Sequence, residues 1–162
     1  MIILGVDPGI GRCGWGVIEV EGGKLKAEGY DCIETVLNGK IEERLLIINK
    51  ELERLIKKYK PDVVSIEELF FGANSKTALT VGQARGVILL SAAKSKLPVA
   101  VYTPLQVKMA LTGYGRADKN QIAQMVKIIL KINVLPKIDD TTDALAIALT
   151  HAFSAKMGKL TH

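Results

Sequence analysis

Acidic residues lie next to apolar runs of this chain, at points where strands are expected to end or a helix to begin. Asp7 follows a short apolar run at the amino terminus, and Glu67 follows a second one. Asp140 and Asp143 lie one helical turn apart, just before a third apolar run. Three separate segments could therefore deliver carboxylates to one point, and carboxylate oxygens are the ligands that divalent cations such as Mg²⁺ prefer.

Carboxylates gathered in this way repel one another and raise each other's pKa, so a fold that gathers them needs a compensating charge. Oxygen ligands favour Mg²⁺ or Mn²⁺ over Zn²⁺. Two such ions roughly 4 Å apart can activate a water molecule and stabilise the leaving oxygen of a phosphodiester. The pattern predicts cleavage of nucleic-acid strands with two Mg²⁺ ions per site, for which Mn²⁺ could substitute.

The first two acids also have simpler interpretations. Asp7 begins an Asp-Pro-Gly sequence, which is typical of a turn. Glu67 could be an exposed strand end, and its neighbour Glu68 must point to the opposite face of a strand. Either acid alone is weak evidence for a site, and only their combination with the others favours one.

The second pair has a structural alternative as well. Asp140 and Asp143 have the spacing of a helix N-cap and an acid in the first turn, where carboxylates stabilise free amides. Asp139 and Asp143 would share a helical face equally well, so the spacing leaves the register of this pair open.

Composition is compatible with a polyanionic substrate. The chain has 162 residues, the length of one domain, with 48% hydrophobic residues, a formal net charge of +5 and a pI of about 9.2. Basic balance suits nucleic acid, although solubility alone would also explain it. Cys13 and Cys32 lack the spacing of a zinc site, and no signal peptide or membrane span is recognisable, so a cytoplasmic protein with reduced thiols is expected.

Apolar periodicity predicts an α/β fold with strands and helices in alternation. The predicted strands are 2–6, 15–20, 25–33, 63–67 and 98–102, and the predicted helices are 41–59, 75–96, 120–130 and 142–154. The first three strands form an antiparallel meander through a Gly22-Gly23 turn, and later strands follow helices, as parallel crossovers require. We expect a mixed five-stranded sheet with helices on both faces, a domain over 1–155 and a flexible tail over 156–162.

Four fragments of the sequence resemble the RuvC family of Holliday-junction resolvases: Gly5-Val6-Asp7-Pro8-Gly9, Ser65-Ile66-Glu67-Glu68-Leu69-Phe70, Gly82-Gln83-Ala84-Arg85-Gly86 and Asp140-Thr141-Thr142-Asp143-Ala144-Leu145-Ala146. The resemblance implies an RNase H-like, retroviral-integrase-like fold and a homodimer that makes paired metal-dependent nicks in four-way junction DNA. By analogy it also implies branch-migration partners of the RuvA and RuvB type. The family's catalytic acids fall on Asp7, Glu67, Asp140 and Asp143, which leaves Asp139 as a helix-start residue.

The resemblance also suggests residues that contact DNA. Phe70 is the candidate for stacking at the junction centre, because aromatic loops can stack on unpaired bases. Its neighbour Phe71 could equally fill a hydrophobic gap under the loop. The basic candidates are Lys108, Lys119, Arg116 and Lys76. A solvated surface is the usual role of such scattered lysines, and the resemblance favours DNA contact most for Lys108 and Lys119.

Two features near the predicted site have no settled role. The helix predicted over 75–96 is apolar nearly all round, so the same helix of a second protomer could cover its outer side, although a fully internal helix would also fit. His151 lies two turns after Asp143 on roughly the same face, where a histidine is more often at the surface than catalytic.

Three other functions share some of these features. An RNase H-like nuclease of the YqgF type, acting on RNA precursors, would carry similar acids. An actin-like nucleotide-binding module would have a strand that ends in Asp-x-Gly, but a second such domain does not fit in this length. A junction-binding protein without catalysis is a further alternative, which the presence of all four acids argues against.

Overall fold

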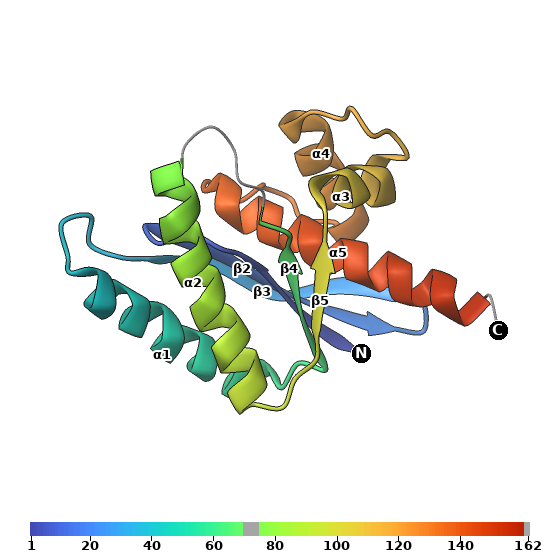
Figure 1. The fold of residues 1–162 in the computed structure, drawn as a ribbon. Helices are drawn as coiled ribbons and strands as arrows, with labels where there is room; N and C mark the ends of the chain where they lie inside the picture. Colours follow the sequence, from blue (N-terminus) through green and yellow to red (C-terminus); the bar gives the residue numbers. More distant parts are fainter. Residues whose placement is uncertain (70–74, 161–162) are drawn as a thin grey trace.

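Five strands form one mixed sheet in the order β3-β2-β1-β4-β5, and helices cover both of its faces (Figure 1). In this computed structural model, residues 1–69 and 75–160 are described. The strands are β1 (Ile2–Asp7), β2 (Arg12–Glu21), β3 (Lys24–Glu34), β4 (Val63–Glu67) and β5 (Val99–Tyr102). The helices are α1 (Ile41–Tyr59), α2 (Ser75–Lys94), α3 (Pro104–Thr112), α4 (Lys119–Leu130) and α5 (Asp139–Leu160). The predicted fold class is confirmed.

Strand pairing places two of the acids side by side. β1 pairs with β2 antiparallel and with β4 parallel, and Val6 lies opposite Ile66 in the second pair. The next residues along these two strands are Asp7 and Glu67. Because parallel strands end at the same edge of a sheet, both carboxylates lie at the carboxyl edge, where open α/β sheets bind ligands. The predicted neighbourhood of Asp7 and Glu67 is confirmed.

The sheet separates two hydrophobic cores. On one face, α1 and α2 pack over Leu4, Val6 and Ile66. On the other face, α5 crosses the sheet, with α3 and α4 beside it, and this core contains Ile3 and Val63. Successive residues of a strand point to opposite faces, so Asp7 and Glu67 fall on the α5 side. The strand alternation thus aims both acids at the helix that carries the other two.

Three glycines let α5 lie directly on the sheet. A Cβ atom at Gly5 would overlap the carbonyl oxygen of Ala144, and one at Gly14 would overlap the carbonyl oxygen of Asp140. At Gly16 an added Cβ would come 2.5 Å from a methyl carbon of Leu145. These glycines lie in the neighbouring strands β1 and β2 and form a bare strip of backbone under the first turns of α5.

Element boundaries differ from the prediction mainly around the helices. α3 was not predicted, although Thr103 caps it, Pro104 opens it and Gln106 completes a capping box. α5 starts at Asp139, earlier than predicted, so Asp140 lies inside the first turn instead of at the N-cap, and the helix continues to Leu160. The division into a domain over 1–155 and a flexible tail over 156–162 stays a prediction.

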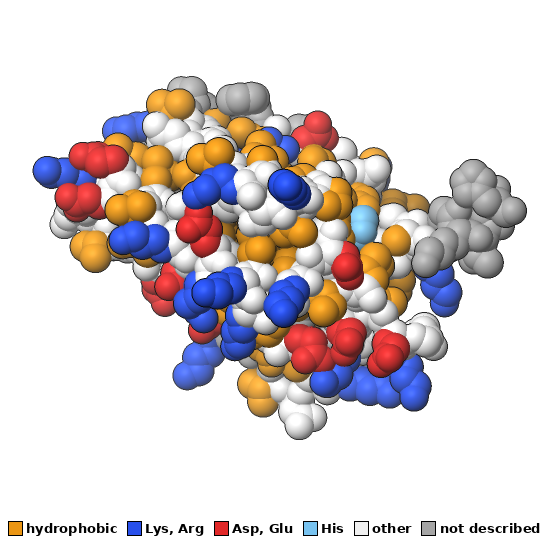
Figure 2. All heavy atoms as spheres, turned by 90° about the horizontal axis from the view of Figure 1, so that it is seen from below, with side chains coloured by type: hydrophobic (Ala, Val, Ile, Leu, Met, Phe, Trp, Pro, Cys, Tyr) orange, Lys and Arg blue, Asp and Glu red, His pale blue; other side chains and the backbone are white. Residues whose placement is uncertain are grey.

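Charged side chains of both signs are spread over one face of the protein. Figure 2 shows one face on which Lys and Arg side chains alternate with acidic and hydrophobic ones instead of forming a continuous basic patch. The net charge therefore does not by itself indicate where a polyanion would lie. Within residues 1–69 and 75–160, no helix has the length and apolar character that a membrane crossing requires.

Substituting Gly5 by alanine tests the contact between α5 and the sheet. The new methyl group would collide with the backbone of α5, which side-chain rotation cannot relieve, so we expect Gly5→Ala to destabilise the fold by about 3 kcal/mol. Urea unfolding would measure the change. In the control Gly11→Ala, the Cβ would meet only the end of the flexible Arg44 side chain at 3.4 Å. Equal stability of the two variants would contradict this account of the packing.

Candidate active site

The strand ends supply the first part of the site. Asp7 ends β1 and Glu67 ends β4, and both are partly buried. Glu68, which follows Glu67, is exposed, as the alternation along a strand predicted. The Asp-Pro-Gly turn exists as well, because the chain leaves β1 at Asp7 and enters β2 at Arg12. The turn and the placement of the carboxylate are therefore compatible.

The first turns of α5 supply the second part. Asp139 is exposed and is the first residue of the helix, in agreement with the expected helix start. Asp140 and Asp143 are partly buried and, three residues apart, lie on one face of α5. The carbonyl of Asp140 lies against Gly14, and Gly14 is the β2 partner of Asp7. The glycine strip therefore brings the start of α5 over the end of β1.

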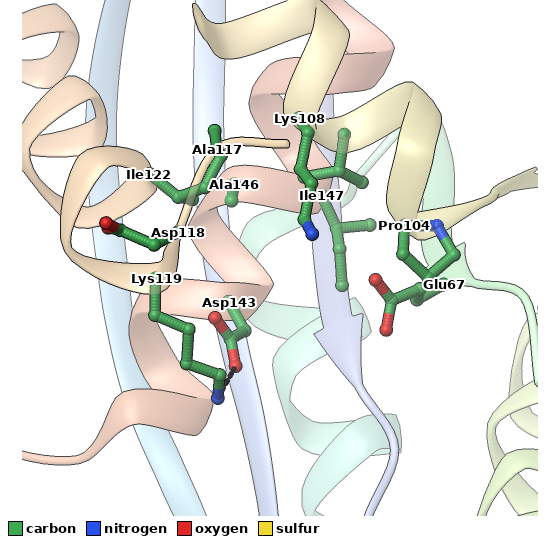
Figure 3. Close-up of a pocket in the computed structure, with 11 residues that line it drawn as sticks. Glu67, Pro104, Lys108, Ala117, Asp118, Lys119, Ile122, Asp143, Ala146 and Ile147 are labelled. Carbon is green, nitrogen blue, oxygen red and sulfur yellow. Dashed lines mark hydrogen bonds and ion pairs between the residues drawn. The ribbon is translucent and has the colours of Figure 1, made fainter. Parts of the chain in front are cut away.

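A pocket of about 320 Å³ opens beside Glu67 and Asp143, with α3 and α4 as its wall (Figure 3). It is lined by Glu67, Pro104, Val107, Lys108, Ala117, Asp118, Lys119, Ile122, Asp143, Ala146 and Ile147. Glu67 and Asp143 lie on opposite sides of it, and the Lys108 amine points in between them. The Lys119 ammonium donates to a carboxylate oxygen of Asp143 at 3.3 Å.

The acids are close enough to change the ionisation of Asp7. Burial raises the pKa of Asp7 to about 8, and the negative charges of Asp143, Asp140 and Glu67 contribute to this rise in that order, while Lys119 opposes them. One carboxylate thus responds to all three of the others. The structure therefore brings the predicted acids from three segments into one electrostatic cluster.

Two further carboxylates of the cluster are shifted in the same direction. Burial raises the pKa of Glu67, with a contribution from Asp143, while Lys119 and Lys108 lower it. Burial also raises the pKa of Asp143, against the effect of the Lys119 ammonium. In return, Asp143 raises the pKa of Lys119. The two lysines thus offset only part of the cost of gathering these acids.

The chemistry of the donor set fits hard divalent cations, since it offers carboxylate oxygens and a deficit of positive charge. In the described part of the chain, however, no three Asp, Glu, His or Cys side chains are arranged as a group that could hold one metal ion. Repulsion between the carboxylates keeps them from approaching one another that closely. In addition, the Lys119 ammonium neutralises part of the negative charge of Asp143. The assignment of the four acids as metal ligands and catalytic residues stays a prediction.

The other predicted site residues are distributed unevenly. Lys108 and Lys119 line the pocket, whereas Arg116 is exposed on the connection between α3 and α4. Lys76 is exposed on the first turn of α2. Phe70 and Phe71 lie outside the described residues. The DNA contacts assigned to all these residues stay predictions.

Sequence reasoning predicted α4 but missed α3, which forms the pocket wall together with it. Both helices begin with a capping box, Thr103 with Gln106 in α3 and Asp118 with Gln121 in α4. A Ser, Thr or Asp followed three residues later by Gln is a readable signal for a helix start. It would have predicted α3 and the position of Lys108 on it.

The sheet order, the helices on both faces and the acids at the carboxyl edge define an RNase H-like nuclease. The chain belongs to the RuvC family, since the family described as "Crossover junction endodeoxyribonuclease RuvC" matches residues 3–151. A relative of that name from Ruminiclostridium cellulolyticum is 54% identical over 99% of this chain and 96% of the relative.

Solved structures agree with this placement. The structure of Thermus thermophilus RuvC in complex with Holliday junction substrate has a TM-score of 0.93 and 39% sequence identity, over 98% of this chain and 96% of that one. A second structure of Thermus thermophilus RuvC has a TM-score of 0.91 at the same identity, over 98% of this chain and 97% of that one. The predicted family is confirmed.

Removing the charge of Asp7 should make the stability of the protein less sensitive to pH. Between pH 3.8 and about 8 the folded state keeps a proton that the unfolded state has lost, so wild-type stability falls as pH rises through this window. An asparagine side chain cannot ionise. Each pKa unit corresponds to about 1.4 kcal/mol, so we expect the stability of Asp7→Asn relative to the wild type to rise by about 5 kcal/mol from the lower end of this window to the upper end, as measured by urea unfolding in chelator.

Glu53 is a control of opposite sign. Its pKa is lowered, mainly by the hydrogen bond from Lys94, so its contribution to stability is lost only when pH falls below its ordinary value of 4.5. Glu53→Gln should therefore differ from the wild type by a constant amount above that pH. A constant difference for Asp7→Asn as well would contradict the raised pKa of Asp7.

Proposed function

We propose that this protein resolves four-way DNA junctions by paired, symmetric hydrolytic nicks at the carboxyl edge of its sheet. The observation that carries the proposal is the single electrostatic cluster of Asp7, Glu67, Asp140 and Asp143. Two of these acids, Glu67 and Asp143, line a pocket that Lys108 and Lys119 also line. Membership of the RuvC family supports the choice of junction DNA as substrate. So does the junction bound in the Thermus thermophilus relative.

In this proposal the four acids hold two Mg²⁺ ions, with Mn²⁺ able to substitute. When bound, such ions would supply a nucleophilic water at neutral pH and stabilise charge on the phosphate. Asp7 has to lose its proton before it can serve as a ligand, because its raised pKa keeps it largely protonated near pH 7. Ion binding and deprotonation of Asp7 should therefore occur together.

The lysines have a complementary task. The Lys119 ammonium pairs with Asp143, and its side chain is 77% exposed, so it can reach a phosphate once another cation neutralises that carboxylate. Lys108 points into the pocket beside Glu67. We propose that both lysines hold the scissile phosphate, and that Arg116 and Lys76 contact the DNA backbone further away. Phe70 is the proposed stacking residue, with Phe71 beside it.

Charge neutralisation at the acids should separate cleavage from binding. We expect Asp7→Asn, Glu67→Gln and Asp143→Asn each to lower the rate of junction cleavage by at least about 100-fold, while binding in chelator stays within about threefold of the wild type. Glu68→Gln is the matched control, because Glu68 is adjacent in sequence but exposed and outside the pocket. It should cut normally.

The assay uses an end-labelled four-way junction, a linear duplex of the same sequence and a structured RNA, each with Mg²⁺ or chelator. Paired nicks at symmetric positions in the junction alone would support the proposal. Cleavage of the RNA in preference to the junction would favour the YqgF-type alternative. Tight junction binding without any Mg²⁺-dependent nick would favour a binding protein, and wild-type cleavage by Asp7→Asn would contradict the site assignment.

Paired nicks require two active sites, so we propose a homodimer formed through the outer face of α2. Leu79, Gln83, Gly86 and Leu90 recur at helical spacing on this face and are all exposed. Leu79 is 64% exposed and Leu90 is 57% exposed. A Cβ at Gly86 would have no neighbour within 4 Å, so a second backbone could approach there.

Branch-migration proteins of the RuvA and RuvB type stay predicted partners. A cytoplasmic location also stays a prediction.

A charge on this face should disrupt the dimer. We expect Leu90→Glu to weaken self-association by at least about 10-fold in sedimentation velocity, because it would bury an unpaired carboxylate, and to uncouple the two nicks. Ile128→Glu is the matched control, since Ile128 is 65% exposed on α4, away from α2. A Leu90→Glu variant that stays dimeric would place the interface elsewhere.

A further inference from the structure

Two side-chain hydrogen bonds tie the strands on one side of the pocket to the helix on the other. The Ser65 hydroxyl, which is fully buried in β4, donates to the carbonyl oxygen of Ile147 in α5 at 3.1 Å. The hydroxyl of Tyr102 in β5 is hydrogen-bonded to Nδ1 of His151 in α5 at 2.8 Å. We call Ser65, Tyr102 and His151 the strand-helix clamp.

The two strand residues of the clamp lie next to Glu67. Ser65 precedes Glu67 by two residues, so both point to the α5 face of the sheet. Tyr102 is the β5 residue opposite Glu67, and its carbonyl accepts the backbone N–H of Glu68 at 2.8 Å. Both strand residues of the clamp are thus adjacent, along or across the sheet, to the carboxylate that ends β4.

On the helix, the clamp continues the stripe that carries an acid. Asp143, Ile147 and His151 follow one another at four-residue intervals and therefore lie on one face of α5. Asp143 and Ile147 both line the pocket. The clamp holds the turn that begins at Ile147, so it fixes the distance from Glu67 on the strand side to Asp143 on the helix side.

Polar groups are a costly way to join a helix to a sheet. Apolar residues at these positions would give similar packing without the loss of hydration that the buried Ser65 hydroxyl and the partly buried Tyr102 and His151 side chains suffer. Hydrogen bonds add direction and a fixed separation, which apolar contacts supply less well. The aromatic rings of Tyr102 and His151 also meet edge to face, with centroids 6.0 Å apart and an interplanar angle of 61°.

The other acids are already fixed by a different device. The glycine strip places α5 on β1 and β2, which sets Asp140 and Asp143 relative to Asp7. β4 has no glycine under α5, because Ser65 occupies the corresponding position as the β4 neighbour of Gly5. The pairing of β1 with β4 sets Glu67 relative to Asp7, and the clamp adds a direct connection from β4 and β5 to α5.

We propose that Ser65, Tyr102 and His151 are positioning residues that hold Glu67 and Asp143 at the separation needed to bind a divalent cation together. The inference rests on the proposed function of these acids as metal ligands. Groups that orient metal ligands commonly change metal affinity by about 10-fold or more when they are removed. Loss of the clamp should therefore weaken ion binding without affecting DNA binding in chelator.

The first test is Tyr102→Phe, which removes one hydroxyl and keeps the ring. We expect Mn²⁺ binding to the protein without DNA, followed by the paramagnetic resonance signal of free Mn²⁺, to weaken by about 10-fold. The Mg²⁺ concentration for half-maximal cleavage should rise by a similar factor, with saturating Mg²⁺ restoring most of the rate. Tyr30→Phe is the matched control, since Tyr30 packs against the same core without a described hydrogen bond from its hydroxyl.

Variants at His151 separate positioning from general destabilisation. His151→Asn keeps a polar atom near the place of Nδ1 and should retain most Mn²⁺ affinity, whereas His151→Phe should lose about as much as Tyr102→Phe. The double variant Tyr102→Phe/His151→Phe should lose no more than either single one, because both break the same bond. If Tyr102→Phe fails to fold, the comparison of His151→Asn with His151→Phe gives the same test. Ser65→Ala gives it as well, since it removes the other hydrogen bond of the clamp and should also weaken Mn²⁺ binding.

Two outcomes would overturn the proposal: wild-type Mn²⁺ affinity in Tyr102→Phe and His151→Phe, or equal losses in Tyr30→Phe and Tyr102→Phe. Failure of the proposed function looks different. In that case the wild type would bind Mn²⁺ and the clamp variants would weaken this binding, yet neither the wild type nor any variant would cut a junction. A wild type that bound no Mn²⁺ would overturn both proposals.

Discussion

The close approach of α5 to the backbone of β1 and β2 is the constraint on which the rest of the structure depends. Gly5, Gly14 and Gly16 leave no side chain between helix and sheet, so the first turns of α5 rest on the strand that ends in Asp7. Any larger residue would lift the helix and separate its two acids from the strand ends. The same approach buries residues 144–149 almost completely, which makes the positioning helix part of the core.

The order of the elements was predictable because each has a strong local signal. Alternating or continuous apolar runs indicated the five strands, helical spacing indicated α1 and α4, and Gly22-Gly23 adopts positive φ at both residues as the predicted hairpin turn requires. α3 was missed because it is short and its large apolar residues, Leu105, Val107, Met109 and Leu111, recur at every second position instead of at helical spacing. The early start of α5 was missed because Asp139 and Asp140 resemble capping residues, whereas the glycine strip below them allows one more turn.

The residue types at the candidate site were also predictable, but their arrangement was not. Strand alternation predicted that Glu67 and Glu68 point to opposite faces, and in the structure Glu67 is partly buried while Glu68 is exposed. The pairing of Lys119 with Asp143 joins residues far apart in sequence, so local patterns contain no sign of it. The same holds for the bond between Tyr102 and His151. Long-range polar contacts depend on tertiary packing, which periodicity does not encode.

The lysines at the pocket show how the fold tolerates a destabilising cluster. Burial and mutual repulsion raise the pKa of three acids, so at neutral pH the folded protein either keeps a proton on Asp7 or accepts a cation. Lys119 is a weak compensating charge, since it is exposed and bonded to one carboxylate only. Full neutralisation by lysines would leave no driving force for a divalent ion. Partial neutralisation preserves the fold, and in the proposed function the remaining electrostatic cost would become affinity for the cation and, through it, for phosphate.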